Sequence, residues 1–192
     1  MHHAALYRPI LDFITGLGLP IVEATLPADT FLPGIAIRDG GLVVDPERLQ
    51  WPADLLHEAG HLAVLPPALR AQAHDDLPGH DDHADAGEQE ALAWAWAATL
   101  HLGIPPEALI HEGGYRGRSR ELLQMYAVGI CPGLRGLCAL GMTTAPGFDT
   151  PGLDAPGLGT PGPDAPGQGV PAPAPGHAPP ARYPQMTRWL RE

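Results

Sequence analysis

Residues 55–63 read Leu-Leu-His-Glu-Ala-Gly-His-Leu-Ala, and this stretch decides how the rest of the chain is interpreted. The apolar residues around it favour a buried helix that starts near Pro52 and ends before the two prolines at 66–67. Residues four apart share one helix face, so the imidazoles of His57 and His61 can reach one ion. Two histidines and a glutamate are costly to bury on an apolar helix unless they are paired or bound to a metal. The pattern therefore predicts a metal site on this helix.

The chemistry expected at this site follows from Glu58, which comes directly after the first histidine of the HExxH pattern. This carboxylate is placed to act as a general base toward an attacking water, while Zn²⁺ polarises a substrate carbonyl. Catalytic zinc normally has three protein ligands and one open position, so a third ligand must come from elsewhere. The downstream candidates are His74, His80, His83, Asp85, Glu88, Glu90 and His101.

Among these candidates the sequence favours Glu90 as the third zinc ligand. Glu90 opens a helix that is otherwise rich in Ala and Trp, and a lone carboxylate in such a helix suggests a partner. The alternative is that Glu90 only stabilises the helix N-terminus through the helix dipole. Glu88 is expected to be solvated and to have that dipole role.

The motif and the helix after it resemble the ImmA/IrrE family of zinc metallopeptidases. The resemblance is carried by HEAGH at residues 57–61 and GEQEALAWAWAATL at residues 87–100, and it covers about residues 30–105. It implies a strand pair that leads into the HExxH helix, a zincin-like helical core, and Glu90 as the third ligand. It also implies a metallo-endopeptidase that cleaves a protein or peptide substrate, such as a regulator or repressor.

Two other functions remain open beside the peptidase. One is a catalytically silent zinc-binding module that regulates or interacts through the same fold. The other is a purely structural zinc protein, which Glu58 disfavours because structural sites are usually closed by four protein ligands. A comparison of hydrolysis by the metal-loaded protein and by Glu58→Gln separates the peptidase from the catalytically silent module.

Residues 1–144 are expected to form one α+β domain, in which a small antiparallel sheet or hairpin precedes a helical core. Residues 34–38 and 41–45 are two β-rich runs, and Asp39-Gly40-Gly41 between them is a hairpin signal. Residues 20–24 form a possible further strand. Helices are expected over residues 6–17, 52–64, 88–102, 106–110, 119–129 and 134–140.

The composition changes after residue 144. Residues 145–181 are dominated by Pro and Gly, with a Pro-Gly pair in each of five successive pentads. They contain too few large apolar side chains to offset the entropy of ordering, which predicts a disordered spacer. In residues 182–192, Met186, Trp189 and Leu190 recur at helical spacing, which predicts a short helix that docks on the main domain or on a partner.

The net charge of the chain limits the classes of partner that it is expected to bind. The 22 acidic residues against 11 arginines give a net charge of −11, which argues against nucleic acid and against an anionic membrane surface. No apolar run reaches the length of about 18 residues needed to span a bilayer, and the first residues lack the features of a signal peptide. We therefore expect a cytoplasmic protein, with Cys131 and Cys138 as buried thiols rather than a disulfide framework.

Two further groups of residues have an open role. The acidic, His-rich loop at residues 74–85 is expected to be solvated, with a second metal site as the alternative. After the core helices, His111 or Tyr115 could stabilise an oxyanion, although a solvated loop is the default. The three arginines that follow could hold a substrate carboxylate, and these are Arg116, Arg118 and Arg120.

Overall fold

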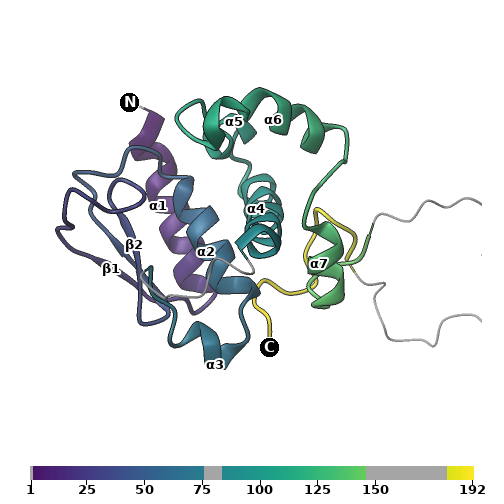
Figure 1. Cartoon of the computed structure of the whole chain (residues 1–192), viewed down its shortest axis with the longest axis horizontal. Coiled ribbons are helices and arrows are strands. Elements are labelled where there is room, and N and C mark those ends of the chain that lie inside the picture. The colour runs from purple at the N-terminus through teal and green to yellow at the C-terminus, as the bar shows by residue number, and fades with distance from the viewer. Residues whose placement is uncertain (1, 76–83, 146–180) are drawn as a thin grey trace, which may run out of the picture.

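A computed structural model describes residues 2–75, 84–145 and 181–192, and in it helices pack beside a small sheet (Figure 1). The strands are β1 (Ile21–Glu23), β2 (Ile35–Arg38) and β3 (Gly41–Val44). The helices are α1 (His2–Gly16), α2 (Asp54–Val64), α3 (Pro67–Arg70), α4 (Ala84–His101), α5 (Pro106–Leu109), α6 (Ser119–Ala127) and α7 (Leu134–Ala139), with a 3-10 turn, η2 (Tyr115–Gly117). The predicted α+β class is confirmed.

The sheet has the order β1-β3-β2, and its hairpin is the one that the sequence predicts. β2 and β3 pair antiparallel, and Asp39 and Gly40 between them have φ angles of 49° and 74°. Positive φ at both central residues is what a tight two-residue hairpin requires. The predicted hairpin is therefore confirmed.

The sheet as a whole is mixed, so the expectation of an antiparallel sheet is wrong for β1, which pairs parallel with β3. The two strands are tied together just beyond their ends. The buried carboxylate of Asp45, which follows β3, accepts a hydrogen bond of 2.9 Å from the backbone N–H of Leu26, which follows β1. Joining the same ends of two strands in this way holds them parallel.

The HExxH helix α2 is central to the fold. It packs on α1, β3 and α4, and its buried face contributes to the main core. α4 is buried from residue 91 to residue 99 and packs on α2, α5 and α7. A Cβ atom at Gly60 would lie only 2.6 Å from the carbonyl oxygen of Ala91, so α4 approaches the HExxH helix at a distance that only glycine permits.

Residues 181–192 lie against the helical core in an irregular conformation, so the short helix predicted there is wrong. Most of their backbone hydrogen bonds go to other parts of the chain rather than to one another. The Trp94 indole N–H donates to the carbonyl oxygen of Trp189 at 2.8 Å, and the Arg191 N–H donates to that of Ala63 at 2.9 Å. The Trp189 ring meets Phe13 edge-on, with the ring centres 5.1 Å apart. Hydrogen bonds to α2 and α4 thus replace helical ones.

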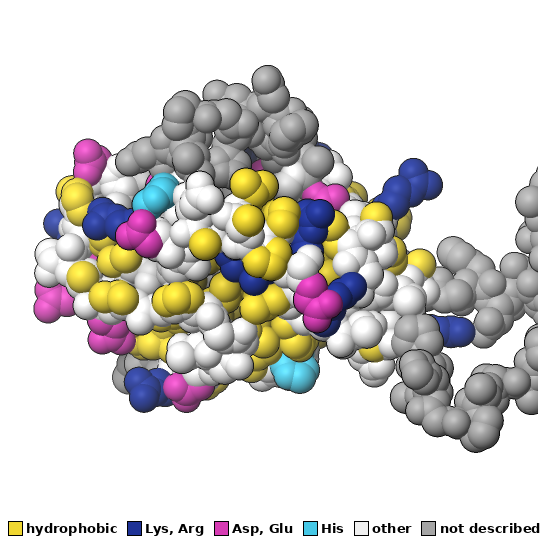
Figure 2. All heavy atoms as spheres, turned by 90° about the horizontal axis from the view of Figure 1, so that it is seen from below, with side chains coloured by type: hydrophobic (Ala, Val, Ile, Leu, Met, Phe, Trp, Pro, Cys, Tyr) yellow, Lys and Arg dark blue, Asp and Glu magenta, His cyan; other side chains and the backbone are white. Residues whose placement is uncertain are grey.

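The end of the chain and α3 lie on the face seen in Figure 2, where hydrophobic side chains gather around arginines. Arg70 of α3 donates hydrogen bonds to the carbonyl oxygens of Leu62, Leu65 and Arg191. Residues 146–180, which hold nearly all of the predicted spacer, lie outside the described residues. Of the helices that the structure describes, none combines the length and apolarity needed to cross a membrane.

Candidate metal centre

Three side chains converge where α2 meets the second turn of α4. The Nε2 atom of His57 lies 3.2 Å from one carboxylate oxygen of Glu88, and that of His61 lies 3.3 Å from the other. One potential ligand atom from each residue lies within 4.8 Å of the other two. Zinc with tetrahedral ligands at about 2.0–2.1 Å would hold neighbouring ligand atoms about 3.3–3.4 Å apart. The donor types and their spacing therefore fit a single zinc ion.

The structure brings the two predicted histidines together but puts Glu88, not Glu90, beside them. Residues two apart on an α-helix point about 200° apart, so only one of these carboxylates can face α2. Glu90 faces α7, where a Cβ atom at Gly136 would collide with its carboxylate. Ala91, which touches Gly60, is three residues after Glu88 and so shares its helix face. Glu88 is exposed, as expected, and its carboxylate also faces the two histidines of α2.

Of the other third-ligand candidates, the two whose side chains the structure describes, His74 and His101, lie outside this cluster. His74 forms an ion pair with Asp39, with 3.3 Å between Nε2 and the carboxylate oxygen. His101 ends α4, about 20 Å along the helix from Glu88. His80, His83, the side chain of Asp85 and most of the loop at residues 74–85 lie outside the described residues.

Glu58 lies on the same helix as both histidines and is half-buried. Burial is the largest influence on its carboxyl group and raises its pKa to about 7. His61 acts in the opposite direction, whereas the carboxylates of Asp75, Glu88 and Asp54 raise the pKa further. A carboxyl group with a pKa near neutrality can both accept and donate a proton at physiological pH.

The pKa of Glu88 is lowered, whereas that of Glu58 is raised. Hydrogen bonds from His57 and His61 hold its pKa well below the ordinary range. Glu88 is therefore ionised at neutral pH, as a metal ligand must be. The pKa values of these two carboxyl groups are thus pushed apart, a pattern that is typical of acid–base sites.

A second group of residues lines the site beside His57. The ring of Tyr115 lies 6.4 Å from the ring of His57, with 23° between their planes. Burial raises the pKa of Tyr115, and the carboxylates of Asp54, Glu88 and Glu58 add to the effect, so the phenol stays protonated. This position agrees with the suggestion that Tyr115 belongs to the site.

His111, in contrast, is buried and does not face the metal centre. Its Nε2 atom lies 2.8 Å from a carboxylate oxygen of Asp54, and Trp51 stacks on its ring with the centres 4.1 Å apart. The Ser119 hydroxyl donates a hydrogen bond of 2.6 Å to the His111 carbonyl oxygen. His111 thus ties the chain before Tyr115 to the first turn of α2. Asp54, its partner, is a further site residue that the sequence did not single out.

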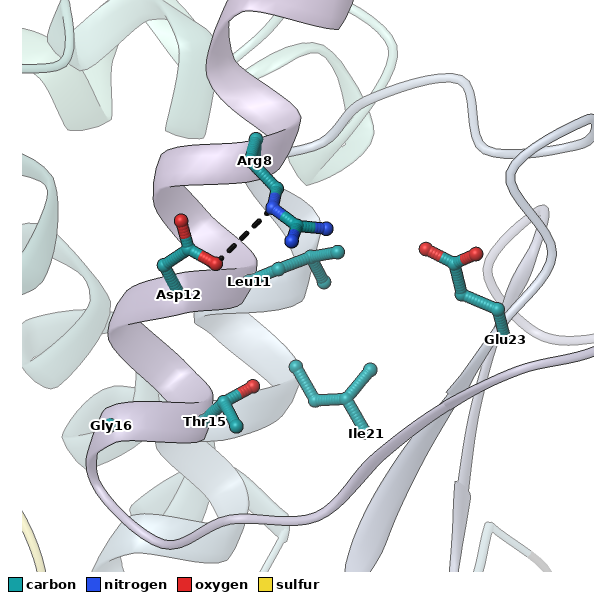
Figure 3. A pocket seen from close by; sticks show the side chains of 7 residues that line it. All are labelled: Arg8, Leu11, Asp12, Thr15, Gly16, Ile21 and Glu23. Atoms are coloured by element: carbon teal, nitrogen blue, oxygen red, sulfur yellow. Dashed lines mark ion pairs between the residues drawn. The ribbon is translucent and has the colours of Figure 1, made fainter.

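A separate groove of about 530 Å³ lies between α1 and β1 (Figure 3). Arg8 and Asp12 form an exposed ion pair of 3.3 Å along it. The groove is lined by Arg8, Leu11, Asp12, Thr15, Gly16, Ile21 and Glu23. It includes none of the candidate metal ligands and is not part of the metal centre.

Comparison with models of protein families, with curated proteins and with solved structures gave no match to this chain. The resemblance to the ImmA/IrrE family therefore stays a prediction.

Proposed function

We propose that the protein is a zinc-dependent metallo-endopeptidase that hydrolyses peptide bonds in a protein or peptide substrate. The observation that carries this proposal is the convergence of His57, His61 and Glu88, with Glu58 on the same helix. Two histidines and one glutamate are a donor set of catalytic zinc, which keeps one position open. Glu88 is 55% exposed and His61 is 25% exposed, so a substrate can approach the cluster from solvent.

The roles of the protein's own residues follow from their positions. Zinc, when bound, would polarise the scissile carbonyl and make water a stronger nucleophile at neutral pH. Glu58 takes a proton from the attacking water and passes it to the leaving amine, as a group with a pKa near neutrality does efficiently. Glu88 supplies the negative charge of the ligand set, and the two histidines bind as neutral imidazoles. Tyr115 covers one side of His57 and restricts water there.

Three further features support the proposed function. We propose that α2 and α4 form a zincin-like core, because the HExxH helix and the helix of the third ligand pack directly on each other. The net charge of −11 favours a protein or peptide over a nucleic acid as the partner. Cys131 and Cys138 are free and half-buried rather than buried as predicted, and free thiols agree with a cytoplasmic location.

The test separates metal binding from hydrolysis. Wild type and Glu58→Gln are loaded with zinc, and each is assayed for metal content and for cleavage of a host-cell protein extract. Both should hold about one zinc ion, and only wild type should cleave. The exposed Glu47→Gln is the matched control, since it makes the same change outside the site and should retain both properties.

Two results would contradict the proposal. Zinc-loaded wild type that cleaves nothing would favour the silent regulatory module. Glu58→Gln that cleaves as fast as wild type would remove Glu58 from the chemistry. The first outcome would reject the peptidase assignment, the second would reject the role of Glu58 as the general base, and neither would remove the metal site.

A further inference from the structure

Two consecutive residues beside the metal centre have a left-handed backbone. Tyr115 and Arg116 have φ angles of 55° and 53°, although neither is glycine. In the described part of the chain the other such residue is Asp39, whose hairpin turn requires that conformation. No hairpin explains residues 115–116. A strained pair of this kind persists only where its surroundings fix it, and such pairs cluster at binding and catalytic sites.

The surroundings of this pair fix it on both sides. Before it, the contact of His111 with Asp54 anchors the chain to α2, and a Cβ atom at Gly113 would lie 3.0 Å from the Trp51 indole nitrogen. Within it, the Tyr115 hydroxyl donates a hydrogen bond of 3.2 Å to the carbonyl oxygen of Leu109. The chain is thus held rigidly where it passes His57.

Arg116 directly follows Tyr115 in this anchored segment and is exposed to solvent. Arg116 and Arg120 are exposed, and within the described residues neither guanidinium group makes a hydrogen bond or an ion pair. Arg118, between them, pairs with Glu121 at 3.2 Å. Among the described residues these two guanidinium groups have no counter-charge, although the chain has twice as many acidic residues as arginines. A planar guanidinium binds a carboxylate through two parallel hydrogen bonds.

We propose that Arg116 is a specificity-determining residue that binds an Asp or Glu side chain of the substrate, so that the centre acts on acidic peptides. The inference rests on the proposed peptidase function. Arg116 follows Tyr115, whose ring centre lies 6.4 Å from that of His57. Tyr115 positions the arginine, and the anchored loop reduces the entropy lost on binding.

The test measures binding, so that it does not depend on turnover. The zinc-loaded, full-length Glu58→Gln protein is titrated into two fluorescent nonapeptide libraries, which are randomised except for a central Glu or Gln. Binding is followed by fluorescence anisotropy at low and high salt. The Glu library should bind roughly threefold to fivefold more tightly, as expected for one exposed ion pair, and salt should reduce the difference.

Three further variants in the same background assign the preference to one side chain. Arg116→Gln should bring the ratio of the two affinities to about one, since it removes the ion pair. Arg8→Gln makes the same change at the distant α1–β1 groove and should leave the ratio unchanged (Figure 3). Arg116→Glu should reverse the preference toward a library with a central Lys, which loss of structure alone would not do.

Equal binding of the Glu and Gln libraries by the parent protein would overturn the proposal. A preference that survives in Arg116→Gln would overturn it as well. If zinc-loaded wild type cleaves nothing, the proposed peptidase function fails separately, and the library titration still decides whether Arg116 binds a carboxylate.

Discussion

The contact between Gly60 and Ala91 couples the packing of α2 and α4 to the metal centre, and Gly60→Ala tests that coupling. The new Cβ atom would lie 2.6 Å from the Ala91 carbonyl oxygen, whereas ordinary van der Waals contact begins at 3.4 Å. The oxygen belongs to the helix backbone, so the two helices must separate locally. Overpacking of this kind costs about 1–3 kcal/mol. The better helix propensity of alanine returns up to about 1 kcal/mol, so we expect a net loss of about 1–2 kcal/mol in the free energy of unfolding.

The same displacement should weaken zinc binding. Glu88 lies one turn before Ala91, so moving α4 away lengthens its distances of 3.2 and 3.3 Å to the two histidines. Zinc sites tolerate deviations of only about 0.2 Å in ligand distance. We therefore expect the zinc affinity of Gly60→Ala to fall roughly tenfold to a hundredfold, in the range found when ligand orientation is disturbed.

The assay combines urea unfolding in excess chelator with zinc titration against a competing chelator. Gly87→Ala is the matched control, because a Cβ atom there meets nothing within 4 Å. It should be neutral or stabilising by up to about 1 kcal/mol and should keep its zinc affinity. A Gly60→Ala protein that binds zinc like wild type and unfolds at the same urea concentration would refute the coupling.

Three other predictions concern the metal-free protein. The folded pKa of Glu58, about 7, exceeds its ordinary 4.5, so its contribution to stability is complete below about pH 4.5 and is lost as the pH rises to about 7. As the pH rises from 5 to 8, the free energy of unfolding of Glu58→Gln should therefore increase by roughly 2–3 kcal/mol relative to that of wild type, as measured by urea unfolding. A difference between the two proteins that does not change with pH would contradict this prediction. Trp189→Ala should lower the free energy of unfolding by about 2–3 kcal/mol, since its ring packs on the core. Leu69→Ala, at a side chain 56% exposed, should change it by less than about 0.5 kcal/mol, and equal effects would argue against docking of the last residues. Asp54→Asn should lower the free energy of unfolding by about 1–3 kcal/mol. In a double-mutant cycle with His111→Gln the two losses should not add, and additive losses would contradict a stabilising contact between Asp54 and His111.

The elements that the sequence predicts correctly are those with local signals. The hairpin follows from Asp39-Gly40, where the turn needs two positive φ angles, and α2 follows from apolar spacing and flanking prolines. The HExxH histidines share a face because helix geometry alone requires it. Each of these features depends on residues only a few positions apart, so a single sequence contains the information.

The elements that the sequence misses depend on distant contacts. Choosing between Glu88 and Glu90 requires the rotation of α4. Residues 91–99 of that helix are buried on every side, so no apolar stripe reveals which face meets α2. The small residues Gly60 and Ala91 are the signal that could have fixed its rotation, since closely packed helices need small side chains at the crossing. The irregular end of the chain is similar, because its hydrogen bonds go to Ala63 and Trp94, far away in sequence.

The most direct test of the central claim is the zinc content and zinc affinity of wild type, Glu88→Gln and Glu90→Gln, measured on the same day with the same buffers. We expect about one zinc ion in wild type and in Glu90→Gln, and loss of tight zinc binding in Glu88→Gln. Glu90→Gln tests the neighbouring carboxylate that faces α7, so it controls for charge and for position in the helix. Tight zinc binding by Glu88→Gln together with its loss in Glu90→Gln would contradict the assignment of the centre, and a wild type without zinc would contradict the account as a whole.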